Sequence, residues 1–337
     1  IVERKLRERM KIPVFHDDQH GTSIIVGAAV LNALEVVGKR IEEARLATSG
    51  VGAAGVACLD MLVALGLKPE NILAVDRDGV LYTGRPHLDP DKARYARPTT
   101  KRTLADIVEG ADIFLGLSAG GILTPAMVAT MADSPIIFAL ANPTPEILPE
   151  EAKKVRPDCI LATGRSDYPN QVNNVLCFPY IFRGALDVGA TGINEAMKLA
   201  CVRAIAALAR MEASDLGSAY GSEVLSFGAD YLIPRPFDPR LLVMLAPAVA
   251  QAAMDSGIAT RPITDMDAYR EKLGQFIYRT SLLMKPVYEC ARSDRKRLVY
   301  AEGEEETVLR AVQTVIDEGL AFPILIGRPD VIETRIQ

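Results

Sequence analysis

The chain has 337 residues, of which 49% are apolar and 24% charged, and its formal net charge is −5. This composition is ordinary for a globular protein with a large core, and the length predicts two or three domains. The acidic balance argues against a nucleic-acid partner, and the uncharged run 21–34 is too short for a membrane-spanning helix, which needs about 20 apolar residues. The five cysteines are scattered and never in a CxxC spacing, so no zinc site or disulfide framework is expected, and a reducing cytoplasm fits.

The block FHDDQHGT, residues 15–22, is the densest group of chemically reactive side chains in the chain. It follows residues 12–14, which predict a short strand, and precedes residues 23–37, which predict a helix. The adjacent carboxylates of Asp17 and Asp18 suit a hard divalent cation, because such ions prefer oxygen ligands. A plain helix cap is the alternative, since Asp or Thr before a helix accepts hydrogen bonds from free backbone N–H groups. The block by itself leaves both interpretations open.

A glycine-rich turn lies between the next two predicted strands. Residues 44–48 predict the first strand, SGVGAAG follows at 49–55, residues 56–65 predict a helix, and residues 71–76 predict the second strand. The turn has the GxGxxG spacing, and Asp76 lies 21 residues after Gly55, which is typical of a dinucleotide-binding unit. A chance glycine-rich turn is the alternative. The predicted nucleotide contacts are Gly50, Val51, Gly52, Ala53, Ala54, Gly55, Asp76, Arg77 and Ser118.

The same alternation of strands and helices continues to residue 163. Residues 112–117, 135–140 and 159–163 predict further strands, with a helix over 124–131. This alternation predicts an α/β fold with a doubly wound, mostly parallel sheet of the Rossmann type. Because ligands bind at the carboxyl ends of the strands in such sheets, the polar loops after the strands are expected to form one site. These loops are residues 50–55, 118–121, 142–144 and 170–174.

More helices and a second α/β pattern follow. Helices are expected over residues 196–209, 239–256 and 267–288, with a polar segment at 214–222. The charged residues 293–297 then precede a new strand–helix–strand pattern at 298–301, 305–318 and 322–327. The predicted domains are residues 1–285 and 297–337, joined by a linker at 286–296. The second is expected to be the truncated start of an α/β domain, too short to bury its own core.

Five segments of the chain resemble the malic enzymes. They are IPVFHDDQHGT at 12–22, the glycine turn at 50–55, ALANPTPE at 139–146, YPNQVNN at 168–174 and FPYIFRGALD at 178–187. These segments stand in the family's order, and the resemblance covers residues 1–285. Residues 297–337 resemble the opening of a phosphate acetyltransferase-like domain. The combination is similar to the large bacterial malic enzymes that carry such a domain at their C-terminus.

The resemblance implies the oxidative decarboxylation of (S)-malate to pyruvate and CO2, with NADP or NAD and with Mg2+ or Mn2+. It implies that Asp18 ligates the metal and that Asp17 is a catalytic-site group beside the family's catalytic lysine. A plain cap or turn acid is the alternative for Asp17. Malate would be bound by Asn142 and by one of Asn173 and Asn174, of which we favour Asn173. The resemblance also implies a homo-oligomer that responds to acetyl-CoA through its C-terminal domain.

The cofactor preference depends on the residues after the second strand of the glycine-turn unit. Asp76 by itself would bond the ribose 2′-hydroxyl and favour NAD. Arg77 follows at once and Arg85 is nearby, and either suits the 2′-phosphate of NADP. Many relatives with the C-terminal extension use NADP, so the resemblance favours NADP.

Several catalytic groups of the family have no counterpart in this chain. The family's general-acid tyrosine, general-base lysine and an acidic pair of metal ligands precede the position that matches Ile1, which stands within a charged helical pattern. We therefore expect a truncated start, and a chain that binds nucleotide without turning over malate. Two other interpretations stay open at this point: a different Rossmann dehydrogenase, and a non-catalytic nucleotide-binding regulatory protein.

Overall fold

The computed structural model describes residues 2–211, 226–317 and 319–336. Within these ranges no helix is both long enough and apolar enough to cross a membrane. The chain divides into two compact units, Ile1–Arg270 and Glu271–Gln337, and each is described by itself. The polar segment predicted at residues 214–222 lies outside the described residues.

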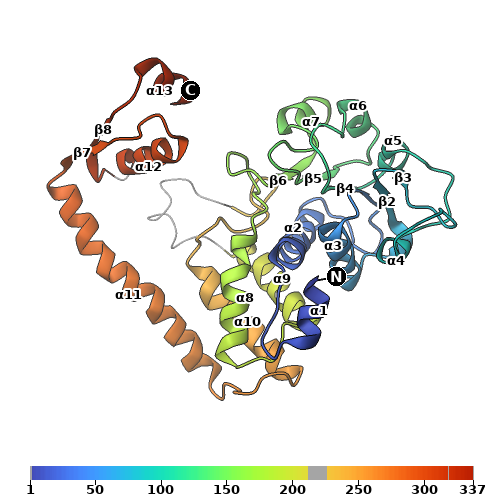
Figure 1. Cartoon of the computed structure of the whole chain (residues 1–337), viewed down its shortest axis with the longest axis horizontal. Helices are drawn as coiled ribbons and strands as arrows, with labels where there is room; N and C mark the ends of the chain where they lie inside the picture. The colour runs from blue at the N-terminus through green and yellow to red at the C-terminus, as the bar shows by residue number, and fades with distance from the viewer. Residues whose placement is uncertain (1, 212–225, 318, 337) are drawn as a thin grey trace. The chain divides into compact units, whose positions relative to one another are not determined.

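A six-stranded sheet forms the centre of the first unit (Figure 1). The strands are β1 (Leu46–Ser49), β2 (Ile72–Asp76), β3 (Gly79–Val80), β4 (Ile113–Gly116), β5 (Ile136–Ala139) and β6 (Ile160–Thr163). They lie in the order β3-β2-β1-β4-β5-β6; β2 and β3 are antiparallel, and all other neighbours are parallel. The predicted α/β fold with a mostly parallel sheet is therefore confirmed. All strands except β3 lie within two residues of their predicted bounds.

The strand predicted at residues 12–14 is wrong. These residues pair with no strand in the part of the chain that the structure describes, and they form an irregular segment between helix α1 (Val2–Arg9) and the π-helical turn η1 (Asp17–Gly21). Ile12 is 58% exposed. An apolar run of three residues forms a strand only when a neighbouring strand and a covering layer bury it, and this run has neither.

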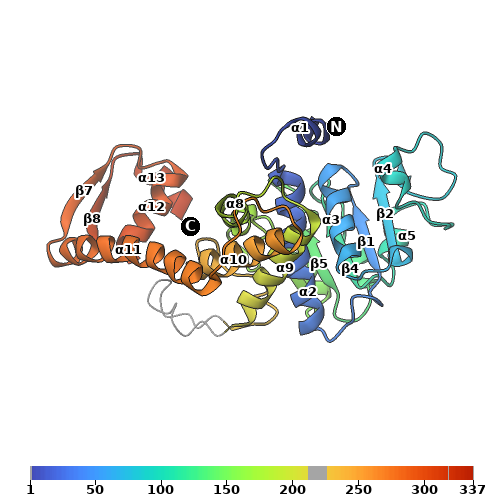
Figure 2. The same cartoon turned by 90° about the horizontal axis from the view of Figure 1, so that it is seen from below.

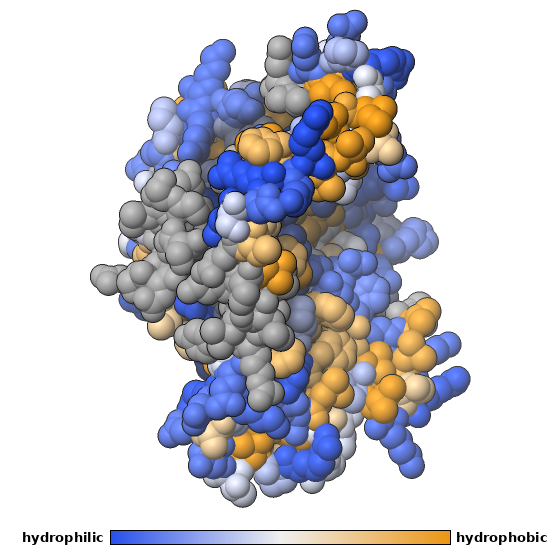
Figure 3. Space-filling model, turned by 90° about the vertical axis from the view of Figure 1, so that its left-hand side faces the viewer, coloured by the Kyte–Doolittle hydropathy of each residue, from blue (hydrophilic) through white to orange (hydrophobic). Residues whose placement is uncertain are grey.

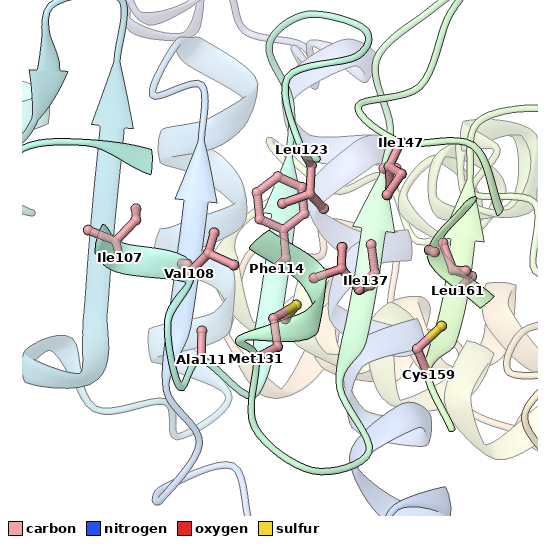
Figure 4. Packing of buried hydrophobic residues seen from close by; sticks show 14 of the residues in the cluster. Ile107, Val108, Ala111, Phe114, Leu123, Met131, Ile137, Ile147, Cys159 and Leu161 are labelled. Atoms are coloured by element: carbon pink, nitrogen blue, oxygen red, sulfur yellow. The ribbon is translucent and has the colours of Figure 1, made fainter. Parts of the chain in front are cut away.

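Helices cover both faces of the sheet. The helices next to the strands are α2 (Thr22–Val36), α3 (Ala53–Ala64), α5 (Leu104–Val108), α6 (Pro125–Ala129) and α7 (Pro149–Val155). Figure 2 shows α2 and α3 on one side of the strands and α5 on the other. On the α5 side, Phe114 and Ile137 point from β4 and β5 into an apolar cluster with Val108 and Met131 (Figure 4). Phe138, the next residue of β5, points to the opposite face and is equally buried. Because both faces of the sheet are covered, its strands are continuous apolar runs in the sequence.

Further helices form a layer outside α2. The remaining elements of the first unit are η2 (Pro69–Asn71), α4 (Pro90–Ala93), η3 (Asn174–Leu176), α8 (Phe178–Asp187), α9 (Glu195–Arg210) and α10 (Arg240–Asp255). α9 packs against α2, and α10 packs against both α8 and α9. The helices predicted at residues 196–209 and 239–256 are confirmed, with each bound shifted by one residue.

The second unit contains a parallel strand pair. Its elements are β7 (Lys296–Tyr300), α12 (Glu306–Asp317), β8 (Ala321–Leu325) and α13 (Pro329–Ile336), and the long helix α11 (Met266–Ser293) precedes them. The predicted strand–helix–strand pattern is confirmed. α11 continues into the predicted linker as far as Ser293, so Asp294 and Arg295 alone separate it from β7. The domain boundaries at residues 285 and 297 stay predictions.

Apolar side chains are exposed on the strand pair of the second unit. Figure 3 looks onto the side of the molecule where Figure 1 draws β7 and α11, and it shows apolar patches at the surface. Leu298 and Val299 of β7 and Phe322 of β8 are among the exposed large apolar residues. Because parallel strands are normally covered on both faces, these side chains mark sheet surface that the described elements of this unit leave open.

Candidate active site

The loops after four parallel strands leave the sheet at one edge. Ser49 of β1 pairs with Gly116 of β4, and Gly116 pairs with Ala139 of β5. Ala139 in turn pairs with Thr163 of β6, so the carboxyl ends of the four strands lie side by side. The structure thus brings together the loops that the sequence predicts to form one site. The candidate residues just beyond this edge include Gly50–Gly55, Ser118, Asn142 and Asn173.

The glycine turn leaves the N-terminus of α3 open. Gly50 has a φ of 98°, and a Cβ there would lie 2.4 Å from the Leu117 carbonyl oxygen. A Cβ on Gly55 would lie 2.1 Å from the carbonyl oxygen of Gly50. Gly52, the N-cap of α3, has extended backbone angles, and a Cβ there would meet nothing within 4 Å. The fold therefore requires Gly50 and Gly55, whereas Gly52 keeps the free N–H groups of α3 accessible to an anion such as pyrophosphate.

The other predicted residues around the turn differ in exposure. Val51 is buried, Ala54 is half-buried and Ala53 is exposed. Ser118 is exposed, and its hydroxyl oxygen lies 2.9 Å from the hydroxyl oxygen of Ser49 at the start of the turn. Ser118 and Ala53 are thus accessible to a ligand, while Val51 packs into the core.

Two cations hold Asp76 at the end of β2. Its Oδ1 accepts a hydrogen bond from Arg85 at 2.6 Å, and its Oδ2 accepts one from Lys92 at 2.6 Å. Burial raises the pKa of Asp76, but the hydrogen bonds from Lys92 and Arg85 outweigh it, so the pKa lies below its usual value. Arg77 is exposed and bonds to no residue that the structure describes. Sequence reasoning missed Lys92, because the short helix α4 brings it to Asp76 from 16 positions downstream.

Asp17 in η1 has a buried oxygen without a partner. Its Oδ1 makes no hydrogen bond to any described residue, and a Cβ on Gly21 would lie 2.2 Å from this atom. The Asp17 carbonyl oxygen accepts from Asn174 Nδ2 at 3.2 Å, and Asn174 Oδ1 accepts from the Thr22 hydroxyl at 3.3 Å. Burial raises the pKa of Asp17, the Asn174 amide lowers it, and the charge of Asp18 raises it again; the pKa is raised overall. A buried polar atom without a partner in a native site calls for an explanation, and a bound cation or proton donor is one.

The three predicted malate-binding asparagines have different surroundings. Asn142 is exposed, and its Nδ2 would lie 3.0 Å from a Cβ on Gly164. The Asn173 side-chain oxygen accepts a 3.0 Å hydrogen bond from the Val175 N–H, while its Nδ2 bonds to no described residue. Asn174 has both ends of its carboxamide engaged by neighbouring residues. This pattern favours Asn142 and Asn173 over Asn174 as residues that face a ligand.

The carboxylates of η1 do not by themselves complete a metal site. Asp18 is exposed beside Asp17. Over residues 2–211, 226–317 and 319–336, no group of three or more His, Cys, Asp or Glu side chains is arranged to hold a metal ion. The unpartnered Asp17 oxygen suits a nearby cation, but one or two carboxylates hold Mg2+ only with the help of substrate groups and waters. The role of Asp18 as a metal ligand stays a prediction.

Replacing Asp17 by asparagine tests this description of its surroundings. The folded-state pKa of Asp17 lies above its unfolded value, so the group stabilises the fold below the unfolded pKa, and this contribution is lost as pH rises through the folded pKa. Asp17→Asn is therefore expected to be more stable than the unchanged chain at neutral pH, with the difference vanishing in acid. Urea unfolding across this pH range measures the effect, and Asp133→Asn, at an exposed position, is the control. A less stable Asp17→Asn variant at neutral pH would refute the description.

A chain of ionisable side chains around the buried Lys198, beside η1, was also missed. Lys198 of α9 is 3% exposed; its Nζ lies 3.1 Å from His20 Nδ1 and donates to Glu195 at 2.7 Å. His20 Nε2 lies 2.8 Å from Oε1 of Glu3 in α1. Burial of His20 and the charge of Lys198 lower the pKa of the His20 imidazole. These side chains help line a cavity of about 770 Å³. The signals in the sequence are His20 within the block at 15–22 and a lysine within an alanine-rich helix, with nothing to indicate that the two meet.

Comparisons with known proteins identify the family of this chain. The family model described as the malic enzyme NAD-binding domain matches residues 19–222, more than half of the chain. The chain belongs to the malic enzyme family. This membership decides against a different family of Rossmann dehydrogenases. A second model, described as phosphate acetyl/butaryl transferase, matches residues 282–337.

Named malic enzymes match this chain over its whole length. The NADP-dependent malic enzyme of Salmonella typhimurium is 63% identical over all of this chain, which covers 45% of that protein. The NAD-dependent malic enzyme of Rhizobium meliloti is 60% identical over all of this chain, which covers 44% of that protein. The crystal structure of the Pyrococcus horikoshii malic enzyme is 40% identical and superposes with a TM-score of 0.68 over 85% of this chain and 65% of its own. The chain thus spans less than half the length of these two curated relatives.

Proposed function

We propose that this chain is the nucleotide-binding and substrate-binding part of an NADP-dependent malic enzyme that converts (S)-malate to pyruvate and CO2. One observation supports this proposal above all. The open turn at Gly52 and the loop with Asn142 lie at the same edge of the sheet, in a chain of the malic enzyme family. A dinucleotide on this turn would direct its nicotinamide half towards β4 and β5, where Asn142 follows the strand. Hydride transfer from C2 of malate requires that the nicotinamide ring lie next to the malate held by Asn142.

The side chains of the site suit these roles. Asn142 and Asn173 would hold malate, because a carboxamide N–H donates to a carboxylate without adding a charge. The unpartnered Oδ1 of Asp17 would accept from a cationic group of the working site, which in the family is the catalytic lysine. Asp18 would contribute one ligand to a Mg2+ or Mn2+ ion. The glycines of the turn would bind pyrophosphate through backbone N–H groups.

The residues around Asp76 support NADP rather than NAD. Overall identity does not decide between the cofactors, since the two relatives at 63% and 60% identity differ in the cofactor that they are named for. Both carboxylate oxygens of Asp76 are engaged by Arg85 and Lys92, so they are poorly placed to accept from a ribose 2′-hydroxyl. Lys92, whose side chain is 29% exposed, is instead placed to meet a 2′-phosphate, while Arg85 is already bonded to Asp76 and to the Gly79 and Val80 carbonyls.

The assembly is proposed on the family resemblance, and the location on the state of the cysteines. We propose a homo-oligomer whose C-terminal unit responds to acetyl-CoA. We also propose a cytoplasmic location, because all five cysteines are unpaired and a reducing compartment suits them.

Titration of the 337-residue chain with NADPH, followed by nicotinamide fluorescence, tests the proposal. We expect saturable binding. Incubation of the same chain with malate, NADP and Mn2+ is expected to produce no NADPH, because the described residues supply too few metal ligands. The longer Salmonella typhimurium relative is the positive control for turnover. A chain that does not bind NADPH would refute the nucleotide assignment, and rapid turnover would refute the proposed separation of binding from catalysis.

A further inference from the structure

Glu146 is a fully buried acid that joins two loops of the site. Its exposed fraction is 0%, and it lies in the loop that follows β5. Its Oε1 accepts a hydrogen bond from the Ser118 N–H at 3.1 Å, in the loop after β4. Its Oε2 accepts one from the Ala141 N–H at 3.0 Å, next to Asn142. One carboxylate therefore joins the backbones of the loops that follow the neighbouring strands β4 and β5.

The surroundings of Glu146 are built to admit its carboxylate. Gly116 ends β4, and a Cβ there would lie 2.3 Å from Glu146 Cδ, so only glycine leaves room for the acid. The same two loops are joined through the backbone, because Gly121 N–H donates to the Pro145 carbonyl and Leu123 N–H donates to the Glu146 carbonyl, each at 3.0 Å. The carboxylate thus sits inside a tight two-loop unit.

The chemistry of the bridge requires an acid. An ionised carboxylate accepts through both oxygens, whereas a carboxamide accepts through one and turns an NH2 group towards the second N–H. Burial raises the pKa of Glu146, and the N–H groups of Ala141 and Ser118 oppose this rise; the pKa is raised overall. No described cation forms an ion pair with it. Burying a carboxylate without a cationic partner costs stability. We therefore expect Glu146 to hold the two loops in a fixed arrangement.

We infer that Glu146 is a positioning residue that fixes the Ser118 loop against the Asn142 loop and so sets the nicotinamide half of the cofactor against malate. This inference rests on the proposed function. The adenine half would lie at the other side of the turn, near Asp76 at the end of β2, which Glu146 does not touch. Loss of the bridge should therefore affect the two halves of the cofactor unequally.

Binding of NADPH and of 2′,5′-ADP by Glu146→Gln tests the inference, because 2′,5′-ADP carries only the adenine half and its 2′-phosphate. In the 337-residue chain we expect the Kd for NADPH to rise about tenfold, because the Ser118 and Asn142 loops no longer hold the nicotinamide half in place, with the Kd for 2′,5′-ADP unchanged. Glu151→Gln, an exposed glutamate on α7, is the matched control and should change neither Kd. Glu146→Asp keeps the charge, but its side chain is too short to reach both N–H groups, so it should raise the Kd for NADPH and leave the Kd for 2′,5′-ADP unchanged. This second variant provides the test if Glu146→Gln does not fold.

Two results would overturn the inference while leaving the proposed function intact. One is equal weakening of both ligands, which indicates a general structural role. The other is an unchanged Kd for NADPH in both Glu146 variants. If the unchanged chain binds neither ligand, the proposed function itself fails, and the inference fails with it.

Discussion

Gly52→Asp is expected to lower the affinity of the chain for NADPH by roughly 100-fold while leaving the fold intact. A side chain at Gly52 meets no protein atom within 4 Å, and the backbone there is extended, so nothing in the fold resists it. Aspartate is a favoured N-cap, and stability should stay the same or rise by a few tenths of a kcal/mol. Its carboxylate would take the place of the pyrophosphate at the N-terminus of α3 and repel its charge. NADPH fluorescence titration and urea unfolding measure the two effects.

The control for this prediction is Gly192→Asp. A side chain at Gly192 also meets nothing within 4 Å, but the residue precedes α9 rather than α3. This variant should bind NADPH like the unchanged chain. If Gly52→Asp kept its affinity, the turn would not be the pyrophosphate site.

Lys92→Ala is expected to lower the affinity for NADPH by about 10- to 100-fold, which corresponds to one charge-assisted hydrogen bond to a phosphate. The affinity for NADH should not fall, because removal of Lys92 also frees Asp76 Oδ2 to accept from a ribose 2′-hydroxyl. The readout is the ratio of the two Kd values. Lys154→Ala, at an exposed lysine of α7, is the control. An equal rise in the Kd values for NADPH and NADH would show that Lys92 supports the loop and does not bind the 2′-phosphate.

The central fold follows from local patterns in the sequence. Parallel strands buried on both faces appear as continuous apolar runs, so β1, β2, β4, β5 and β6 stand out. The spacing of the glycine turn encodes a backbone geometry that side chains would block at Gly50 and Gly55. The two residues of β3 are too few to leave a pattern. The apolar run at 12–14 resembles a strand but finds no partner.

The interactions within the site depend on distant contacts and were not predictable from local patterns. Lys92 reaches Asp76 because a short helix folds back, and Glu146 reaches the Ser118 N–H across 28 positions. Lys198 meets His20 across 178 positions. The family motif contains both Asn173 and Asn174 as candidates for malate binding. Only the hydrogen bonds in the folded chain distinguish their surroundings. Sequence patterns thus predicted the edge of the sheet where the candidate site lies, while the pairing of its charged side chains required the fold.

Hydrogen–deuterium exchange of the 337-residue chain with and without NADP tests the central claim most directly, because it locates the bound nucleotide. We predict slower exchange in three segments: residues 49–56 at the glycine turn, residues 76–92 around Asp76, and residues 117–121 beside Ser118. Exchange in the second unit should not change. Unaltered exchange at residues 49–56 under saturating NADP would contradict the account.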